Sequence, residues 1–253
     1  MKKSEELFCW KLESLFEKHH ILLPTQSLPK TDKKVLQQGI YHSGDTGNNT
    51  FSPPGKSIYM SPILQGNIND IAEGNETVLY DQGRAETGLK QCVFGKTSYS
   101  NTDIFVCDNH NRVLWVFEKY KKIQPLLIHI DQHKDEALFH PDCNEKNYET
   151  HSRVCDYIPL AKKFAWIQSS HISLTNSEEL QKFQTKTLPD TPIILNIDID
   201  IFAKECCHLS TEEIVISIIK TAKKASVICL ATSPLFIPQN LAQNITKILW
   251  KYL

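Results

Sequence analysis

The chain lacks any apolar run that approaches the ~20 residues needed to span a membrane, so we expect no membrane-spanning segment. Its N-terminal residues are charged and lack the apolar stretch of a secretion signal. The formal net charge is only −1, which gives no reason to expect nucleic acid or a strongly acidic partner. Together these absences predict a cytoplasmic protein that binds neither membranes nor nucleic acid.

The chain also lacks a C-x-x-C pair and any visible internal repeat. Because no secretion signal precedes its eight cysteines, we expect free thiols in a reducing compartment. The cysteines are Cys9, Cys92, Cys107, Cys143, Cys155, Cys206, Cys207 and Cys229.

The length of 253 residues and the hydrophobic content of 41% fit one large α/β domain over residues 1–253. Residues 5–19 predict an amphipathic helix that packs against the domain, with a dimer contact or a peptide-leader contact as the alternative. Its apolar face would comprise Leu7, Phe8, Leu12, Leu15 and Phe16. Residues 24–100 are loop-rich, with Gly, Asn, Ser and Pro dense through 43–55, which indicates a binding or lid region, or partial disorder.

From residue 103 to residue 253, predicted strands alternate with predicted helices. Such alternation is typical of a mostly parallel sheet with helices on both faces. Capping-box patterns at 175–178 and 210–213 mark two helix starts. We predict strands at 104–106, 113–117, 126–130, 164–167, 193–197 and 227–230, and helices at 153–163, 175–183, from 210 onward, and at 241–253.

Potential metal ligands follow three of these strands, where open α/β sheets place their sites. A lone Asp-x-Asp is more often a cap or turn, but three such pieces in order favour a metal site. Six oxygen and imidazole ligands exceed the needs of one tetrahedral zinc and suit two hard divalent ions. His129, within a strand, is expected to be a core histidine. The six candidates are His110, Asp131, His133, Asp135, Asp198 and Asp200.

This order of motifs resembles the ureohydrolases, the arginases and agmatinases, in which a lone His precedes Asp-x-His-x-Asp and then Asp-x-Asp. More closely, residues 107–117 followed by 128–135 look like the peptide arginases, which are found in pathways for ribosomally made, modified peptides. The resemblance covers roughly residues 103–238 and says little about residues 1–100. It implies a three-layer arginase/deacetylase-like fold.

The resemblance also implies how the ligands divide between two Mn²⁺ ions. Asp131 and Asp198 would bridge the ions. His110 and Asp135 would complete the first site, and His133 and Asp200 the second, consistent with the preference of Mn²⁺ for oxygen ligands. Deacetylases of the related fold have a His in place of Asp200 and bind one zinc, so Asp200 favours two metals.

A proton shuttle for the leaving amine is also implied. In arginases a His follows the Asp-x-His-x-Asp motif near the next helix. His151 fits this place best, His140 is the second candidate, and a chain with neither is the remaining alternative.

Two departures from classical arginases bear on the substrate. The turn Ala231–Pro234 has no Glu to hold the guanidinium, so another acid must pair with it, or the hydroxyls and carbonyls of Thr232 and Ser233 would partly replace the Glu. The loop 136–141 does not match the loop that binds free α-amino and α-carboxylate groups. Both favour an arginine within a peptide.

The resemblance therefore implies a manganese hydrolase of linear amidine C–N bonds that converts arginine residues of a ribosomally made precursor peptide to ornithine and urea. The alternatives are a small-guanidine ureohydrolase, a deacetylase-like metal amidohydrolase, and a binding module without activity. Arginases often form closed oligomers, but the sequence shows no interface.

Overall fold

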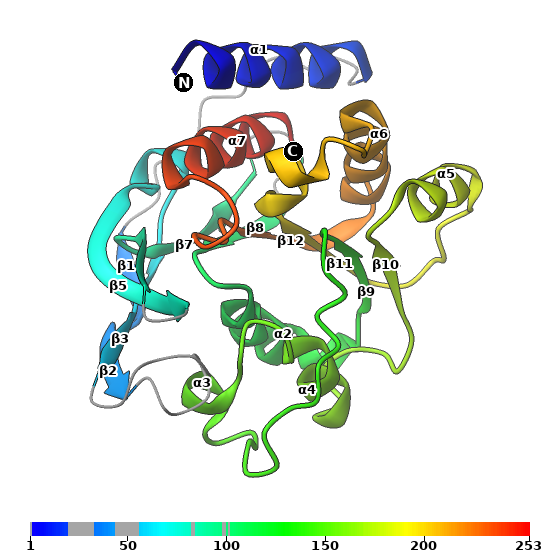
Figure 1. Cartoon of the computed structure of the whole chain (residues 1–253). Helices are drawn as coiled ribbons and strands as arrows, with labels where there is room; N and C mark the ends of the chain where they lie inside the picture. The colour runs from blue at the N-terminus through cyan, green and yellow to red at the C-terminus, as the bar shows by residue number, and fades with distance from the viewer. Residues whose placement is uncertain (1, 20–32, 44–55, 82–83, 98–99, 101) are drawn as a thin grey trace.

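The computed structural model describes residues 2–19, 33–43, 56–81, 84–97, 100 and 102–253. Its centre is an eight-stranded sheet with the strand order β1-β4-β7-β8-β12-β11-β9-β10 (Figure 1). Strands β8, β12, β11, β9 and β10 run parallel, and β4 runs parallel to β7. Within this sheet, the β1–β4 and β7–β8 pairs are antiparallel. The prediction of an α/β fold with a mostly parallel central sheet is confirmed.

The strands of this sheet are short. They are β1 (Lys34–Gln37), β4 (Ile63–Gln65), β7 (Cys92–Lys96), β8 (Asp103–Cys107), β9 (Leu126–Ile130), β10 (His171–Leu174), β11 (Ile193–Asp198) and β12 (Ala225–Ala231). Two antiparallel pairs lie beside it: β2 (Ile40–Ser43) with β3 (Ser57–Met60), and β5 (Glu73–Asp81) with β6 (Arg84–Leu89).

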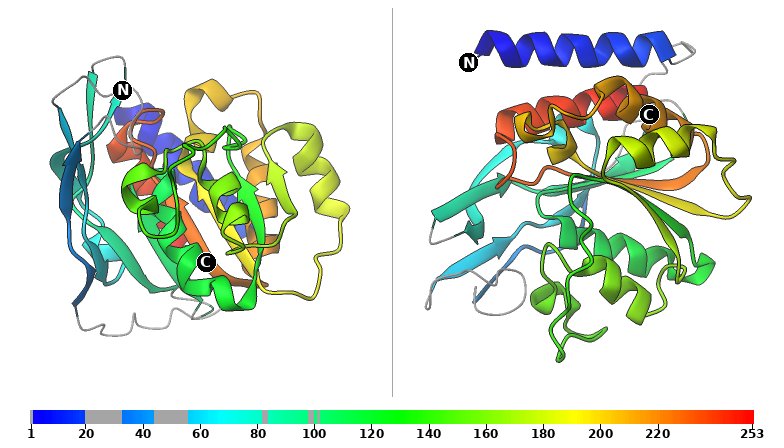
Figure 2. Two further views of the ribbon diagram at one scale, coloured as in Figure 1. Left: turned by 90° about the horizontal axis from the view of Figure 1, so that it is seen from below. Right: turned by 45° about the vertical axis from the view of Figure 1, so that its right-hand side comes forward.

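Helices cover both faces of the sheet (Figures 1 and 2). On one side lie α5 (Ser177–Thr185), α6 (Thr211–Ala222) and α7 (Gln239–Tyr252). On the other lie α2 (Leu114–Tyr120), α3 (Tyr148–His151) and α4 (Tyr157–Lys163). Short 3-10 turns, η2 (His110–Val113), η4 (Ile199–Phe202) and η5 (Lys204–Cys206), follow the ends of β8 and β11.

The central strands bury both faces because successive side chains point to opposite sides. In β9, Ile128 and Ile130 join the apolar cluster beneath α6 and α7, whereas Leu127 joins the cluster beneath α2 and α4. Strand β11 repeats this alternation with Leu195 and Ile194. Continuous apolar runs are therefore what this sheet requires.

Helix α1 (Lys2–His19) packs across α7 and α6 as an outer layer. Leu12 and Phe16 are fully buried, and the Phe16 ring stacks on Tyr252 with 5.6 Å between centroids. The predicted packing against the domain is confirmed. Leu7, however, lies on the outer side and is 51% exposed, so its inclusion in the buried face was wrong.

Two predicted strands are helix or turn instead. Residues 113–117 continue from η2 into α2, where Leu114 and Phe117, three residues apart, face the core together. Residues 164–167 form a turn around Ala165, whose φ of 54° no strand can hold. Both segments are rich in aromatic and β-branched residues, which favour strands in isolation but pack here as irregular or helical core.

The predicted loop region holds more structure than expected. Within the described part of 24–100, strands β1 to β7 form, and β1, β4 and β7 extend the central sheet. The Gly- and Asn-rich stretch 44–55 and residues 20–32 lie outside the described residues.

The helix starts differ slightly from the predictions. Ser210 caps α6 as predicted, accepting from the Glu213 N–H. The cap of α5 is Asn176 rather than Thr175, because Asn176 accepts from the Glu179 N–H while Glu179 reaches back to Thr175. Helix α4 begins at Tyr157, later than the predicted residue 153.

Candidate metal centre

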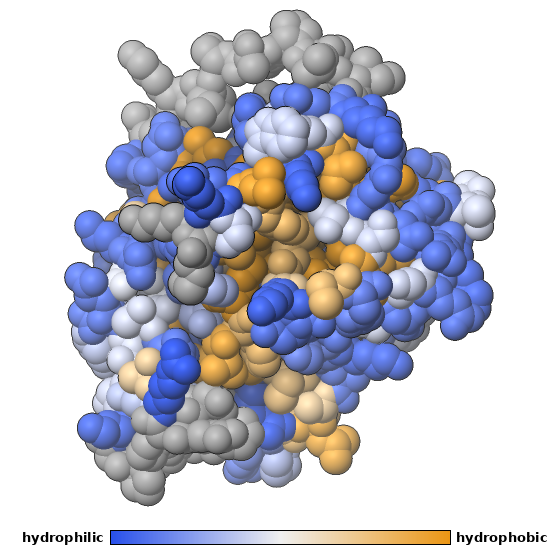
Figure 3. Space-filling model, turned by 45° about the horizontal axis from the view of Figure 1, so that its top comes forward, coloured by the Kyte–Doolittle hydropathy of each residue, from blue (hydrophilic) through white to orange (hydrophobic). Residues whose placement is uncertain are grey.

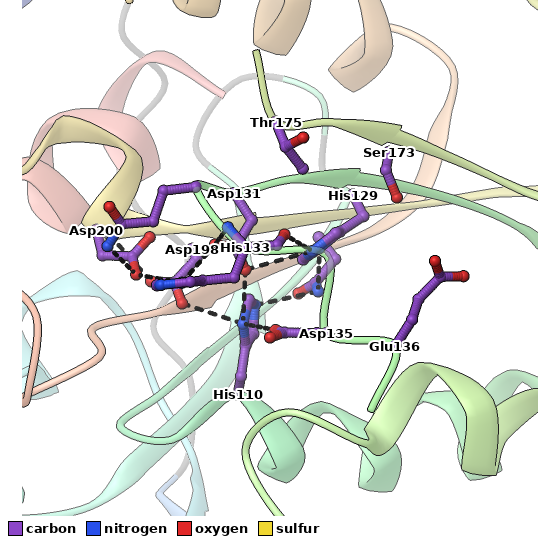
Figure 4. A network of polar contacts seen from close by, with 12 residues as sticks. His110, His129, Asp131, His133, Asp135, Glu136, Ser173, Thr175, Asp198 and Asp200 are labelled. Carbon is purple, nitrogen blue, oxygen red and sulfur yellow. Dashed lines mark hydrogen bonds and ion pairs between the residues drawn. The ribbon is translucent and has the colours of Figure 1, made fainter. Parts of the chain in front are cut away.

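The sheet order brings the three predicted motifs to one place. Strands β8, β12, β11 and β9 are adjacent and parallel, so their carboxyl ends meet at one edge. His110 follows β8, Asp198 ends β11 and Asp200 follows it, and Asp131 follows β9. The close-up shows all six predicted ligands around one centre (Figure 4). The described residues thus form a cluster of two imidazoles and four carboxylates.

His110 lies at one end of this cluster and faces three carboxylates. Its Nδ1 lies 3.0 Å from Asp135 Oδ2, 3.1 Å from Asp198 Oδ2 and 3.2 Å from Asp131 Oδ2. Its side chain is buried, as are Asp131 and Asp198, whereas the Asp135 side chain is 9% exposed. Four potential ligand atoms therefore converge on the region next to this imidazole nitrogen.

His133 lies at the other end. Its Nδ1 is 3.2 Å from Asp200 Oδ2 and 3.4 Å from Asp131 Oδ1. Asp131 thus presents one oxygen to each histidine, Oδ2 toward His110 and Oδ1 toward His133. This is the arrangement expected of a carboxylate that joins two metal positions.

The cluster fits a cation. His110 Nδ1, Asp131 Oδ2 and Asp200 Oδ1 are buried and make no hydrogen bond among the described residues, although the first two lie 3.2 Å from each other. Two ligand groups can be drawn, His110, His129 and Asp131 on one side and Asp131, His133 and Asp200 on the other, and Asp131 belongs to both. Buried atoms of this kind are costly without partners, and a divalent ion would supply them. These His/Asp groups could hold a metal.

The pKa shifts describe the same crowding. Burial, reinforced by the charge of Asp198, raises the pKa of Asp131 well above its usual value. Burial and Asp198 likewise raise the pKa of Asp200. Burial lowers the pKa of His110, but Asp198 and the other nearby carboxylates outweigh it and raise that pKa well above its usual value. The carboxylates of Asp131 and Asp200 raise the pKa of His133 to about 10.

These shifts predict how a metal should stabilise the protein. In metal-free protein, groups with raised pKa, such as Asp131 and Asp200, contribute stability at low pH and lose it as pH rises. Metal binding requires deprotonated ligands and strengthens as pH rises. The difference in Tm between Mn²⁺-loaded and metal-free protein should therefore widen between about pH 5.5 and about pH 8.

Paired thermal melts with Mn²⁺ and with a chelator would measure this difference. Asp131→Asn is the control, since it should flatten the pH dependence. A difference that stays constant or narrows with rising pH would contradict binding of a cation through these titrating ligands.

A buried polar network contacts His110 and His129 on the ring nitrogens that face away from the carboxylates. Asn196 Nδ2 donates to Tyr157 Oη at 2.8 Å and lies 3.1 Å from His110 Nε2. His129 Nδ1 lies 3.2 Å from Tyr157 Oη, while its Nε2 lies 3.3 Å from Asp131 Oδ2. Partners on the far ring nitrogen orient an imidazole toward a metal. His129 is fully buried, as a core histidine would be, but it also borders the cluster.

Two cluster residues adopt left-handed backbone conformations. Asp135 has φ 49° and Ser233 has φ 44°, a region that non-glycine residues seldom occupy. Ser233 Oγ donates to Asp198 Oδ2 at 2.6 Å, and Gln132 Nε2 donates to Asp200 Oδ2 at 2.8 Å. Backbone strain held at a site is a recognised mark of function.

A pocket of about 240 Å³ opens onto the cluster. His110, His133, Asp135 and Asp198 form part of its lining. The rest comprises Leu79 from β5, Asn109, residues 136–137, 154–155 and 233–236. The Phe236 ring lies 4.7 Å from that of His133. A pocket of this size accepts one side chain rather than a large ligand.

The predicted proton shuttle is not part of this lining. His151 ends α3, and its Nδ1 is 2.9 Å from Thr150 Oγ1. The rings of His140 and His151 are 6.4 Å apart, so the two candidates are neighbours. Val154, three residues after His151, does line the pocket.

The turn after β12 is also partly different from the prediction. Thr232 is fully buried and lies 3.1 Å from Gln239 Oε1. Ser233 lines the pocket, but its hydroxyl already donates to Asp198. Thr232 is therefore not available to a substrate in the pocket.

Several supporting residues were not predicted. Asn196 shares the alternate-residue phase of Asp198 in β11, and a polar residue inside an apolar run was the available signal. His129 was expected to be a core histidine, but it shares that phase with Asp131 and also borders the cluster. Tyr157 and Phe236 come from distant segments, and nothing in their local sequence marks them.

Comparison with family models, curated proteins and solved structures found no match to this chain. In the part of the chain that the structure describes, no helix is long and apolar enough to cross a membrane.

Proposed function

We propose that this chain is a binuclear manganese hydrolase that converts arginine residues of a peptide to ornithine with release of urea. The observation that carries the proposal is the position of Asp131, whose two oxygens face His110 and His133 separately at the ends of a six-ligand cluster. The order of these ligands along the chain resembles that of the arginases, and the three-layer arginase-like fold is part of the same proposal.

The described residues would divide the work as follows. His110 and Asp135 would hold one ion, His133 and Asp200 the other, and Asp131 and Asp198 both. When bound, such ions supply Lewis-acid activation of water. Gln132 fixes Asp200, and Ser233 fixes Asp198. The apolar side chains of Leu79 and Phe236 line the pocket and would exclude bulk water from a bound substrate, which would strengthen the electrostatic interactions inside it.

The guanidinium needs an acid outside the cluster. Among the described residues that line the pocket, Glu136 is the carboxylate that is not one of the proposed ligands. It lies apart from the cluster, 3.4 Å from Lys162 Nζ and 3.5 Å from His171 Nε2 (Figure 4). We assign Glu136 the role of pairing with the guanidinium of the substrate. The guanidinium would compete with Lys162 for the Glu136 carboxylate.

Metal analysis combined with urea release tests the proposal. Purified protein with Mn²⁺ should bind two ions per chain and release urea from an arginine-containing peptide, with a mass loss of ~42 Da in the peptide. Release of acetate from an acetylated substrate would instead indicate the deacetylase-like alternative. Metal binding without turnover of either substrate would indicate a binding module.

Peptidyl arginine should be preferred over free arginine and agmatine. Free arginine carries an ammonium group and a carboxylate at its α-carbon. After Glu136 the pocket lining continues with Ala137, whose side chain cannot pair with either charge. Leaving those charges unpaired should reduce kcat/KM at least ~10²-fold relative to a peptide. Steady-state kinetics on the three substrates measures the ratio. Equal kcat/KM values would leave an ordinary small-guanidine ureohydrolase.

A further inference from the structure

A second hollow adjoins the candidate active-site pocket. Its volume is about 850 Å³, against about 240 Å³ for the pocket itself. Phe236 lines both, so the two spaces are neighbours at this side chain. Neither the metal centre nor the proposed hydrolysis accounts for this larger space.

Three segments form the walls, and we call the space the apolar groove. Residues 4–8 of α1 form one wall, residues 201–214 after Asp200 another, and residues 236–241 a third. Phe8 and Phe202 meet edge to face inside it, with 6.3 Å between ring centroids. The apolar lining residues are Phe8, Ile201, Phe202, Ala203, Leu209, Ile214, Phe236, Ile237 and Leu241.

The groove has the composition of a binding site for an apolar group. Lys204 and Glu205 are exposed among its lining residues and Glu5 joins them, so charged side chains surround an apolar floor. In the space-filling view, apolar surface gathers near the middle of the face shown, with hydrophilic residues around it (Figure 3). Most of the apolar lining residues are themselves buried, but Phe236 is 41% exposed, and apolar surface open to solvent marks a place where a partner group binds.

The position of the groove selects its occupant. Ile201 directly follows the proposed ligand Asp200, and the Phe236 ring lies 4.7 Å from that of His133. Under the proposed function, the arginine side chain in the small pocket belongs to a peptide. Consecutive Cα atoms of a peptide are only about 3.8 Å apart, so the next residues stay near the pocket. A neighbouring side chain that passes Phe236 therefore enters the groove.

We propose that the apolar groove binds a bulky apolar side chain that lies within two positions of the target arginine in the substrate peptide. The inference rests on the proposed function and deepens it, because it states a sequence requirement of the substrate. Burial of one large apolar side chain predicts a gain of roughly 10- to 100-fold in kcat/KM.

Paired peptides test this requirement. A series of arginine peptides with Ala at all flanking positions is compared with peptides that carry Phe at each of the four nearest positions. The wild type should favour Phe at one of them. Cys207→Trp, which places bulk in the groove from an exposed position, should abolish that preference and leave the rate on the all-Ala peptide unchanged. His208→Trp, exposed but outside the groove lining, is the matched control and should keep the preference.

Photo-cross-linking separates the groove from the chemistry. A peptide with benzoylphenylalanine beside the arginine should cross-link to residues 201–209 or 236–241, mapped by mass spectrometry, and Cys207→Trp should prevent it. Groove cross-links without urea release from any peptide would support the groove and refute the proposed function. Urea release with cross-links elsewhere, or with none, would refute the groove alone. A dimer that Cys207→Trp dissociates would assign the groove to a second copy and overturn the inference.

Discussion

Asp131→Ala should abolish hydrolysis and release at least one metal ion per chain. Asp131 is fully buried and presents one oxygen to each histidine of the cluster, so its loss removes a ligand from both proposed metal positions. We expect kcat to fall by at least ~10⁴-fold, because activation of water and its orientation fail together. Elemental analysis after gel filtration and a urea assay measure the two effects.

Two further variants make this result specific. Asp131→Asn keeps the shape of the side chain and should give the same loss of activity with an intact fold by circular dichroism. Asp142→Ala removes a carboxylate whose side chain is 81% exposed and should change nothing. Full activity in Asp131→Asn would remove the bridging assignment.

His151→Ala should reduce kcat by roughly 10²–10⁴-fold while the metal content stays intact. His151 is the proposed shuttle for the leaving amine, but its side chain does not line the pocket. For this role, residues 152–154 must move when substrate binds and bring the His151 imidazole toward the pocket. Such motion is common in active-site segments.

His140→Ala is the companion variant, since the two rings are 6.4 Å apart. If His151 is the shuttle, His140→Ala should retain most activity, and added imidazole should partly restore His151→Ala. A nearly normal rate for His151→Ala would transfer the role to His140 or to solvent.

The cluster could be predicted from sequence because its ligands follow continuous apolar strands. In a parallel sheet every strand carries its last residues to the same edge, so strand ends at 107, 130 and 198 had to converge once β8, β12, β11 and β9 were neighbours. The pocket walls had no such constraint. Leu79 and Phe236 reach the site from separate segments, and only tertiary packing places them.

The errors in the fold have a related cause. The sequence 113–117 is a continuous apolar run, as in a buried strand, but in the structure it follows directly from the η2 turn at His110, and helix α2 buries Leu114 and Phe117. Strands β1 to β7 are only partly buried, and most of them are short, so their apolar periodicity is too weak to distinguish them from loop. Where burial is complete, as in β9 and β11, the predicted strands were correct.

The central position of β12 has a consequence for folding during synthesis. Strand β12 lies between β8 and β11, and Ser233 just beyond it fixes Asp198. Until residues 225–233 have left the ribosome, β12 cannot join β8 to β11, and the strands on either side of it remain separate. Most of the proposed ligands emerge much earlier. Nascent chains arrested before residue 225 should expose the apolar edges of β8 and β11, which makes them targets for chaperones and prone to aggregation.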